Sequence, residues 1–364
     1  MNDTQRILQE SANRLLSDLC TRAVGDAAEQ GTWPAGLWRA LEETGLAAAA
    51  RSEARGGSGG DIHHVYVLVK AVGAHAAPVP LPETLLAEQA LDAAGLPAAD
   101  GPATIAPVLR GDRLAISRRG GKIRLSGVAH RVPWARDART LVLLADDGGQ
   151  AATVRLDCPG VEAQGWNHAR EPRDTLRFDD AAISPDAIGA PGAGLGHDDL
   201  YLRGALARAV AMAGALETVL RLTVNYARER VQFGRPIGKF QAVQQQIAVL
   251  ATHVAASNAA VQAAIAAHAS GGGDFQVAAA KTRVGQAAGI AAAIAHQVHG
   301  AMGFTHEHDL HRSTRRLWAW RDEFGSEVEW AMWLGRSAAR TGGEQLWPFL
   351  TSQRHTQAEE ASSL

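Results

Sequence analysis

The sequence predicts a chain of three successive parts: an N-terminal helical domain, a small β domain and a C-terminal helical bundle. Apolar residues recur at helical spacing in residues 1–102 and again, more strongly, in residues 194–364. Residues 103–193 instead contain short β-branched and apolar runs that Gly, Asp and Pro separate. With 364 residues, the chain is long enough for several domains and a large core. We therefore expect domain boundaries near residues 102 and 193.

Two leucine series predict the first helices, Leu8, Leu15, Leu16 and Leu19 in one and Leu37, Leu41 and Leu46 in the other. A glycine-rich stretch follows at residues 55–61. Some glycine-rich loops bind phosphate, but no strand precedes this one and no Lys-Ser/Thr pair ends it. We therefore interpret it as a turn between helices.

The β domain is predicted from six runs, which are Thr104–Leu109, Arg113–Ser117, Lys122–Ser126, Thr140–Ala145, Ala152–Leu156 and Thr175–Phe178. The sequence Asp146-Asp-Gly-Gly149 between two of them is typical of a hairpin turn.

The C-terminal region contains long helical patterns, carried by Leu206, Val210, Ala213, Leu216 and Leu220, and then by Phe240, Val243, Ile247, Leu250 and Val254. A third run, from Phe275 to His299, is mostly alanine. Small residues let helices approach closely, which favours an antiparallel bundle. A last helix is expected from Ser326 to Arg340, with Val328 and Met332 facing inward.

Composition excludes several classes of partner. The 36 basic and 38 acidic side chains nearly cancel, which argues against nucleic acid and acidic membranes and favours a small molecule or another protein. Cys20 and Cys158 have neither a disulfide pattern nor metal-ligand spacing. Because the first residues lack the pattern of a secretion signal and no long unbroken apolar run follows, we expect a cytoplasmic protein without a membrane span.

Two motifs in the C-terminal region carry the strongest functional signal. Residues 226–241, Tyr-Ala-Arg-Glu-Arg-Val-Gln-Phe-Gly-Arg-Pro-Ile-Gly-Lys-Phe-Gln, join a helix end to a glycine turn and a second helix. The later segment is Gln297-Val-His-Gly-Ala-Met-Gly-Phe-Thr. Together the two motifs resemble the acyl-CoA dehydrogenase family, whose members oxidise acyl-CoA thioesters with FAD. Trp38–Gly45 and Leu176–Asp186 are similar to that family's entry helix and last middle strand, so the resemblance covers nearly the whole chain.

The resemblance implies an acyl-CoA dehydrogenase-like fold with an all-α N-terminal domain, a middle β domain and a C-terminal four-helix bundle. It also implies FAD as cofactor, an acyl-CoA substrate and an electron-transfer acceptor. In the family, the positions of the two motifs contact the adenine dinucleotide half of an FAD that is lodged mainly in a neighbouring subunit. We therefore expect an oligomer.

A dinucleotide needs cations or amides at its pyrophosphate, an apolar surface for its adenine, and glycines where backbone approaches closely. The two motifs supply all three. The predicted FAD-contacting residues are Arg230, Gln232, Phe233, Gly234, Ile237, Phe240, Gln297, Gly300 and Gly303. The alternative is that Arg230 and Phe233 only finish a helix, which the presence of both motifs in the family's order disfavours.

The family's catalytic base has no direct counterpart. Dehydrogenation requires a carboxylate that removes the α-proton of the thioester. The family usually carries it as the Glu of a Tyr-Glu-Gly-Thr-like motif, and this chain has Glu323-Phe324-Gly325-Ser326, which puts Phe324 at that place. Some members carry the base near the start of the first bundle helix, where ungapped matching puts Gly204. Glu323 is one residue away, but one step along a helix rotates a side chain by about 100°, and the alternative is a Glu on a solvated face or in a helix cap.

The flavin-ring pocket of the family also lacks counterparts here. Its Thr-Glu-Pro-x-Ala-Gly-Ser-Asp loop is missing from Thr104–Arg113, and its Trp-Ile-Thr/Ser segment is replaced by Gly127–Trp134. Trp134 either replaces the ring's wall or, more commonly for a Trp beside Pro, packs in the core. His308 and His311 have a spacing that can ligate a metal, but two histidines are a loose signal and we predict no metal site.

The sequence therefore favours a subunit of a heteromer, for example a heterotetramer, similar to the family members of steroid and related lipid catabolism that consist of two unlike chains. Its homologous partner supplies the base and the flavin-ring pocket. Two alternatives remain open: a self-sufficient homo-oligomeric dehydrogenase that uses Glu323 as a displaced base, and a catalytically dead structural paralogue.

Overall fold

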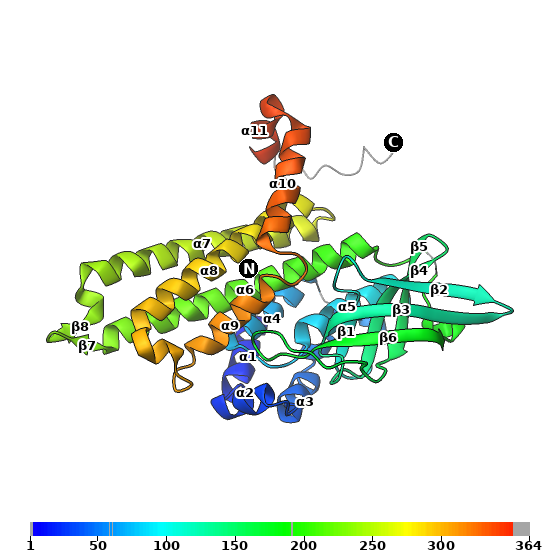
Figure 1. The fold of residues 1–364 in the computed structure, drawn as a ribbon, viewed down its shortest axis with the longest axis horizontal. Helices are drawn as coiled ribbons and strands as arrows, with labels where there is room; N and C mark the ends of the chain where they lie inside the picture. The colour runs from blue at the N-terminus through cyan, green and yellow to red at the C-terminus, as the bar shows by residue number, and fades with distance from the viewer. Residues whose placement is uncertain (1–2, 58, 60, 191, 352–364) are drawn as a thin grey trace. The chain divides into compact units, whose positions relative to one another are not determined.

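The computed structural model describes residues 3–57, 59, 61–190 and 192–351 (Figure 1). The chain forms two compact units, which divide between Ala207 and Arg208 inside a long helix. Each unit is described separately below. The predicted domain limits at residues 102 and 193 stay a prediction.

The first unit begins with a set of helices, as predicted. They are α1 (Asp3–Leu19), α2 (Arg22–Glu29), α3 (Ala35–Glu43), α4 (Ile62–His75) and α5 (Leu81–Ala93), with short 3-10 turns η1 (Leu46–Ala48) and η2 (Glu53–Arg55). Side-chain caps start two of them: Thr21 accepts from the Val24 N–H before α2, and Asp61 accepts from the His63 N–H before α4. The predicted turn at residues 55–61 lies between η2 and α4, although Ser58 and Gly60 lie outside the described residues.

The middle of this unit is a mixed sheet, and all six predicted strands are confirmed. They are β1 (Ala103–Ala106), β2 (Arg113–Arg119), β3 (Lys122–Pro133), β4 (Thr140–Asp147), β5 (Gln150–Asp157) and β6 (Arg173–Ala182), followed by the turn η3 (Pro185–Ala187). The strand order is β1-β4-β2-β3-β6, with β5 paired to β4. The two contacts β1/β4 and β2/β4 are parallel and the other pairings antiparallel. The predicted hairpin joins β4 to β5, where Asp146 accepts from the Gly149 N–H at 2.8 Å.

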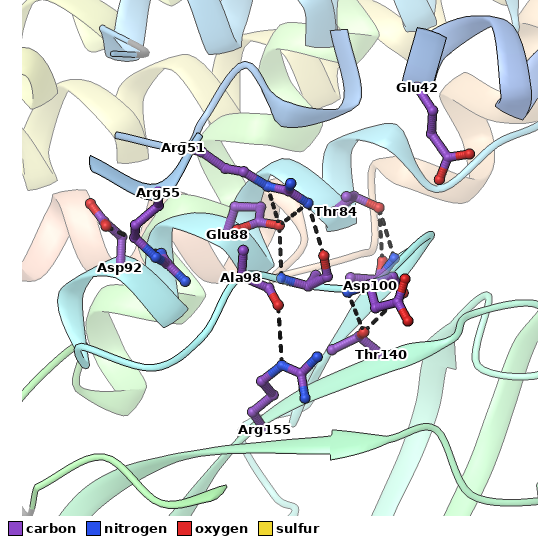
Figure 2. A network of polar contacts seen from close by, with 12 residues as sticks. Glu42, Arg51, Arg55, Thr84, Glu88, Asp92, Ala98, Asp100, Thr140 and Arg155 are labelled. Atoms are coloured by element: carbon purple, nitrogen blue, oxygen red, sulfur yellow. Dashed lines mark hydrogen bonds and ion pairs between the residues drawn. The ribbon is translucent and has the colours of Figure 1, made fainter. Parts of the chain in front are cut away.

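A polar network fixes the segment that connects α5 to β1 (Figure 2). Glu88 of α5 is fully buried, and its Oε1 accepts from Arg51 Nε at 2.8 Å and from the Ala99 N–H at 3.0 Å. The Arg51 guanidinium also donates to the Ala99 carbonyl at 2.9 Å. The Thr84 and Thr140 hydroxyls hold the end of the segment next to β1, through bonds to the backbone of Ala103 and Asp100. A buried carboxylate is tolerated here because it is paired and hydrogen-bonded.

The second unit contains most of the helix α6 (His197–Glu229), which begins in the first unit, and then α7 (Gln241–Ala269) and α8 (Asp274–His299). It continues through the 3-10 turn η5 (Gly300–Phe304) to α9 (Leu310–Trp320), α10 (Glu327–Thr341) and α11 (Gly343–Thr351). The alanine-rich α8 is buried along most of its length and packs against α7, α9 and α10. This bundle confirms the predicted C-terminal helices.

The predicted orientation of the last helix is wrong. Val328 and Met332 are 62% and 52% exposed, whereas Trp330 is buried at 4% and its Nε1 donates to the Phe324 carbonyl at 2.9 Å. A helix advances about 100° per residue, so residues two positions before and after Trp330 lie on the opposite face from it. The larger side chain, which also finds a hydrogen-bond acceptor, decides which face of α10 is buried.

One helix among the described residues, α7, is long and apolar enough to cross a membrane by length and composition. This is weak evidence for a span, because long apolar helices of folded proteins meet the same criterion.

Candidate dinucleotide-binding site

The first motif folds as a small hairpin between α6 and α7. The strands β7 (Val231–Gln232) and β8 (Arg235–Pro236) pair antiparallel, and the turn η4 (Ile237–Lys239) leads into α7. Phe233 and Gly234 form the tip, and both have positive φ, at 51° and 78°. Two successive left-handed residues are typical of a type I′ turn. Glycine adopts this backbone without strain, whereas Phe233 does so at a cost.

This hairpin presents an aromatic side chain to solvent. Phe233 is 93% exposed, and its ring meets the Phe240 ring edge-on at 6.1 Å. Arg235 lies over the Phe240 ring at 4.3 Å, and Arg230 at the start of the hairpin is exposed. Beyond its contact with Phe240, this exposed Phe in a strained backbone conformation adds little to the stability of its own chain, which makes it a candidate for contact with another molecule.

The second motif lies at the end of α8 and in η5. Gln297 and Gly300 line a pocket of about 370 Å³ together with Gly289, Ala292, Ala293, His296, Phe304 and Trp318. A Cβ at Gly300 would meet no atom within 4 Å, so this position is open to a ligand. A Cβ at Gly303 would lie 2.9 Å from the His299 Cβ, and this glycine therefore lets η5 pack closely on α8.

A ring contact brings the two motifs together in space. Tyr226 of the first motif stacks on His299 of the second, with ring centroids 4.5 Å apart and planes 27° apart. The hairpin tip does not reach the pocket, because Arg230 and Phe233 are absent from the residues that line it. The predicted dinucleotide residues thus form two neighbouring surfaces, one with an exposed aromatic and one with an open groove. These surfaces offer a guanidinium at Arg230, an amide at Gln297 and open backbone at Gly300, with the rings of Phe233 and Phe240 beside them. Such groups fit the adenine half of FAD.

The region of the expected base is a closed turn between α9 and α10. Glu323 is partly buried, and its Oε2 accepts from Arg208 Nε of α6 at 2.6 Å, with the two side chains 9% and 3% exposed. Phe324, where the resemblance expects the base, is 3% exposed and has a φ of 52°. Neither Gly204 nor Ala207, the residue directly before Arg208, carries a carboxylate. The carboxylate that directly precedes Phe324 in the sequence is therefore held by a guanidinium.

Sequence reasoning missed Lys281, which supports this turn from α8. Its Nζ is fully buried and donates to the carbonyls of Arg321 at 2.7 Å and Gly325 at 2.6 Å, with Trp320 at 3.4 Å. Burial lowers the pKa of Lys281 to about 7, although Glu323 and Asp322 raise it. A lysine in an alanine-rich helix gives no sequence signal for such a role, because its acceptors are backbone carbonyls of a distant turn.

The middle domain has no exposed wall for a flavin ring at Trp134. This side chain is 5% exposed and meets the Trp33 ring edge-on at 6.5 Å, so it packs in the first unit. The β1–β2 connection forms part of a smaller pocket of about 250 Å³, lined by Pro107, Leu109, Arg110, Asp112, Arg113, Leu114, Asp146, His197, Asp198 and Tyr201.

The paired histidines of the sequence do not form a metal cluster. The His311 Nδ1 bonds to the His308 carbonyl at 2.8 Å. No group of three or more His, Cys, Asp or Glu side chains suited to a metal occurs in the part of the chain that the structure describes.

Comparison with known proteins identifies the family. The family model for the acyl-CoA dehydrogenase N-terminal domain matches residues 2–98, and the model for the acyl-CoA dehydrogenase C-terminal domain matches residues 202–326. Acyl-CoA dehydrogenase IpdE2 of Mycobacterium tuberculosis is 32% identical over 281 residues, which cover 77% of this chain and 79% of that relative.

Solved structures share the fold over nearly the whole chain. The ChsE4-ChsE5 complex of M. tuberculosis contains a chain with a TM-score of 0.85 and 24% identity, covering 94% of this chain and 99% of the other. The Tcur3481-Tcur3483 steroid ACAD, solved as a variant, matches with a TM-score of 0.81 and 26% identity over 93% and 98% of the two chains. The predicted family and fold class are confirmed. The chain belongs to the acyl-CoA dehydrogenase family, whose members are FAD flavoproteins.

Proposed function

We propose that this chain is one subunit of a hetero-oligomeric acyl-CoA dehydrogenase that introduces an α,β double bond into an acyl-CoA thioester. It contributes the adenine-dinucleotide side of a shared FAD site, and a homologous partner subunit supplies the base. The observation that carries the proposal is the state of the base region, where Phe324 replaces the carboxylate and Glu323 is paired with Arg208 at 2.6 Å.

An ion pair of this kind holds the carboxylate of Glu323 in place. Its Oε2 accepts from Arg208 Nε at 2.6 Å, and this contact would have to break before that oxygen could take a proton from a substrate. Burial with a direct hydrogen bond also removes the carboxylate from the reach of a substrate's α-carbon, since a base needs hydrogen-bond distance to the proton it removes. These two effects argue against a self-sufficient enzyme with Glu323 as a displaced base.

The exposed apolar side chains support an assembly with another subunit. Most of the exposed large hydrophobic residues of the described chain lie in the second unit, including Phe233 at 93%, Phe304 at 71% and Val328 at 62%. Exposed apolar groups that gather into a contiguous patch mark interaction surfaces, and the proposal places a partner subunit against this unit. The structural relatives include the ChsE4-ChsE5 complex and the Tcur3481-Tcur3483 steroid acyl-CoA dehydrogenase. The first favours a heteromer for this chain, and the second favours a steroid-derived acyl group.

The proposed roles follow from the residues present. FAD, when bound, accepts the hydride that the β-carbon of the substrate loses. Arg230 supplies a positive charge to the pyrophosphate, while Phe233 and Gln297 contact the adenosine end. The chain's own contribution is thus to bind and orient the dinucleotide, and the proton is removed by the partner's carboxylate.

The test compares the chain alone with the chain reconstituted with a homologous subunit that has a Glu at a base position. We expect FAD to co-purify in full stoichiometry only with the complex, and dehydrogenation of acyl-CoA to require both chains. Arg230→Ala should release FAD from the complex, whereas Arg221→Ala, at an exposed position earlier in α6, should retain it. Tight FAD binding and full activity of the chain alone would contradict the proposal. An active complex insensitive to Arg230→Ala would favour a purely structural role.

A further inference from the structure

The helix α10 has little packing within its own chain. Among its 15 described residues, from Glu327 to Thr341, only Trp330 is buried. Its first residue lies against Gly285 of α8, and the helix then extends away from α7 and α8, with α11 at its far end (Figure 1). A single helix of this length is only marginally stable in water, because most helical stability comes from the packing of an apolar face. The exposed side of α10 is therefore a candidate for packing against another molecule.

This exposed side carries an apolar stripe. Its members recur at positions i, i+3, i+4, i+7 and i+11, which lie on one side of a helix. They are Val328, Ala331, Met332, Gly335 and Ala339, and all five are exposed. Val328 and Met332 supply the apolar surface, and the distance between two packed helices depends on how small the side chains at the contact are. A Cβ at Gly335 would meet no atom within 4 Å, so no contact within its own chain requires a glycine there.

The charges beside the stripe change sign along the helix. Glu329 lies in the first turn, Arg336 and Arg340 lie near the other end, and all three are exposed. At about 100° per residue, the three side chains fall on the same flank of the stripe. Two antiparallel α10 helices would bring each Glu329 beside the arginines of the other copy. Two parallel helices would instead place like charges side by side, which is unfavourable.

We propose that α10 pairs with α10 of a second copy of this chain, antiparallel and about a two-fold axis. Val328 then faces Ala339 of the other copy, and Met332 faces Gly335. Each larger side chain thus lies against a small one, and each acidic end lies beside a basic end. A two-fold interface between identical chains requires this kind of self-complementary surface. The presence of a homologous subunit in the same assembly rests on the proposed function, whereas the pairing of two copies does not.

Disulfide cross-linking tests both the occupant and its orientation. Val328→Cys and Ala339→Cys are made separately in the full chain. The two positions are about 16 Å apart along one helix, so each residue lies level with the other position of the second copy and about 16 Å along the axis from its own equivalent. A disulfide joins Cα atoms no more than about 7 Å apart. On mild oxidation, an equimolar mixture of the two variants should therefore give covalent dimers, and neither variant alone should.

Two controls accompany the cross-linking, which is done on the chain alone and on the reconstituted complex. Wild type gives the background from the natural Cys20 and Cys158. Ala259→Cys, at an exposed position of α7, replaces Ala339→Cys in a second mixture and should give no covalent dimer.

Gly335→Leu tests the close approach of the two helices. Leucine is a better helix former than glycine, and the position is open within its own chain, so the fold should be kept. We expect the self-association measured by sedimentation velocity to weaken by roughly 5- to 150-fold, the range for overpacking a close contact. Gly36→Leu is the matched control, because a Cβ at this exposed glycine of α3 also meets no atom within 4 Å. Its self-association should equal that of the wild type.

Three results would overturn the pairing. They are covalent dimers from Val328→Cys alone, which a parallel pair would give, no covalent dimer from the mixture, and cross-linking to the homologous subunit in place of a second copy. Unchanged self-association of Gly335→Leu would also contradict it. The proposed function is judged separately by FAD content and activity. A chain that pairs through α10 but binds FAD tightly and is fully active alone would contradict that function and leave the pairing in place.

Discussion

Glu323→Gln distinguishes a structural carboxylate from a displaced base. The Arg208–Glu323 contact is 2.6 Å long, and the two side chains are 3% and 9% exposed. Removing one partner of a buried ion pair leaves the other charge uncompensated, which typically costs about 3–5 kcal/mol. We therefore expect the free energy of unfolding to fall by an amount near this range, less whatever the Gln amide recovers by hydrogen bonding.

The assay is equilibrium urea unfolding followed by tryptophan fluorescence, with α-proton exchange of the acyl-CoA measured in the reconstituted complex. Asp147→Asn is the control, because Arg118–Asp147 is also 2.6 Å long but Arg118 is 49% exposed, and its loss should be clearly smaller. The double variant Arg208→Met/Glu323→Leu should recover much of the lost stability, since it removes both buried charges. Unchanged stability of Glu323→Gln combined with abolished proton exchange would refute the reasoning and assign the base to Glu323.

Three further predictions concern other parts of the chain. Burial lowers the pKa of Lys281 from 10.5 to about 7, so between these pH values the unfolded chain binds a proton that the folded chain lacks, and stability rises with pH. In the wild type, the free energy of unfolding in urea should rise from pH 7 to 8 to 9, by at most about 1.4 kcal/mol per pH unit. In Lys281→Met this rise should be absent. Glu88→Ala should lower the unfolding free energy by at most about 3–5 kcal/mol, because it removes the acceptor of Arg51 Nε and of the Ala99 N–H while Arg51 keeps its bond to the Ala99 carbonyl. A loss below about 1 kcal/mol in a urea titration would contradict this. Phe233→Ala should change the free energy of unfolding by less than about 0.5 kcal/mol, because the side chain is 93% exposed. The same variant should lower the amount of FAD that the complex retains. A large loss of stability would contradict the assignment of Phe233 to an interaction surface.

Local patterns were sufficient to predict most of the elements. The six strands follow from β-branched runs bounded by turn residues, and the β4–β5 hairpin from Asp146-Asp-Gly-Gly149. The lengths of the strands were predicted less well than their positions. The predicted run ends at Ser126, whereas β3 continues from Lys122 to Pro133 through register shifts that only its pairing with β6 reveals. The buried face of α10 was also predicted wrongly, because it too depends on tertiary contacts that the local sequence does not show. Apolar residues lie on both sides of that helix, and tertiary packing of Trp330 decides between them.

The dinucleotide residues were predicted from motifs, whereas the side chains packed around them were not. Trp318 comes from α9, and nothing in its local sequence places it beside Gly289. The same holds for Arg208 and Glu323, which are separated by 115 positions in the chain. Contacts of this kind depend on how helices pack, and helical periodicity fixes only which face of each helix is buried.

The contacts of the α9–α10 turn oppose a backbone shift that would bring Glu323 to the position where the resemblance expects the base. Lys281 bonds to carbonyls on both sides of the turn, Trp330 Nε1 bonds to the Phe324 carbonyl, and a reciprocal capping box joins Ser326 to Glu329 at the start of α10. Moving Glu323 forward by one residue would break these bonds and leave the ammonium of a buried lysine without acceptors, at a cost of about 1–3 kcal/mol for each lost group. A shift of the backbone is therefore disfavoured by the same contacts that keep Phe324 in its left-handed conformation. If the complex removes α-protons, the carboxylate that does so should belong to the partner subunit.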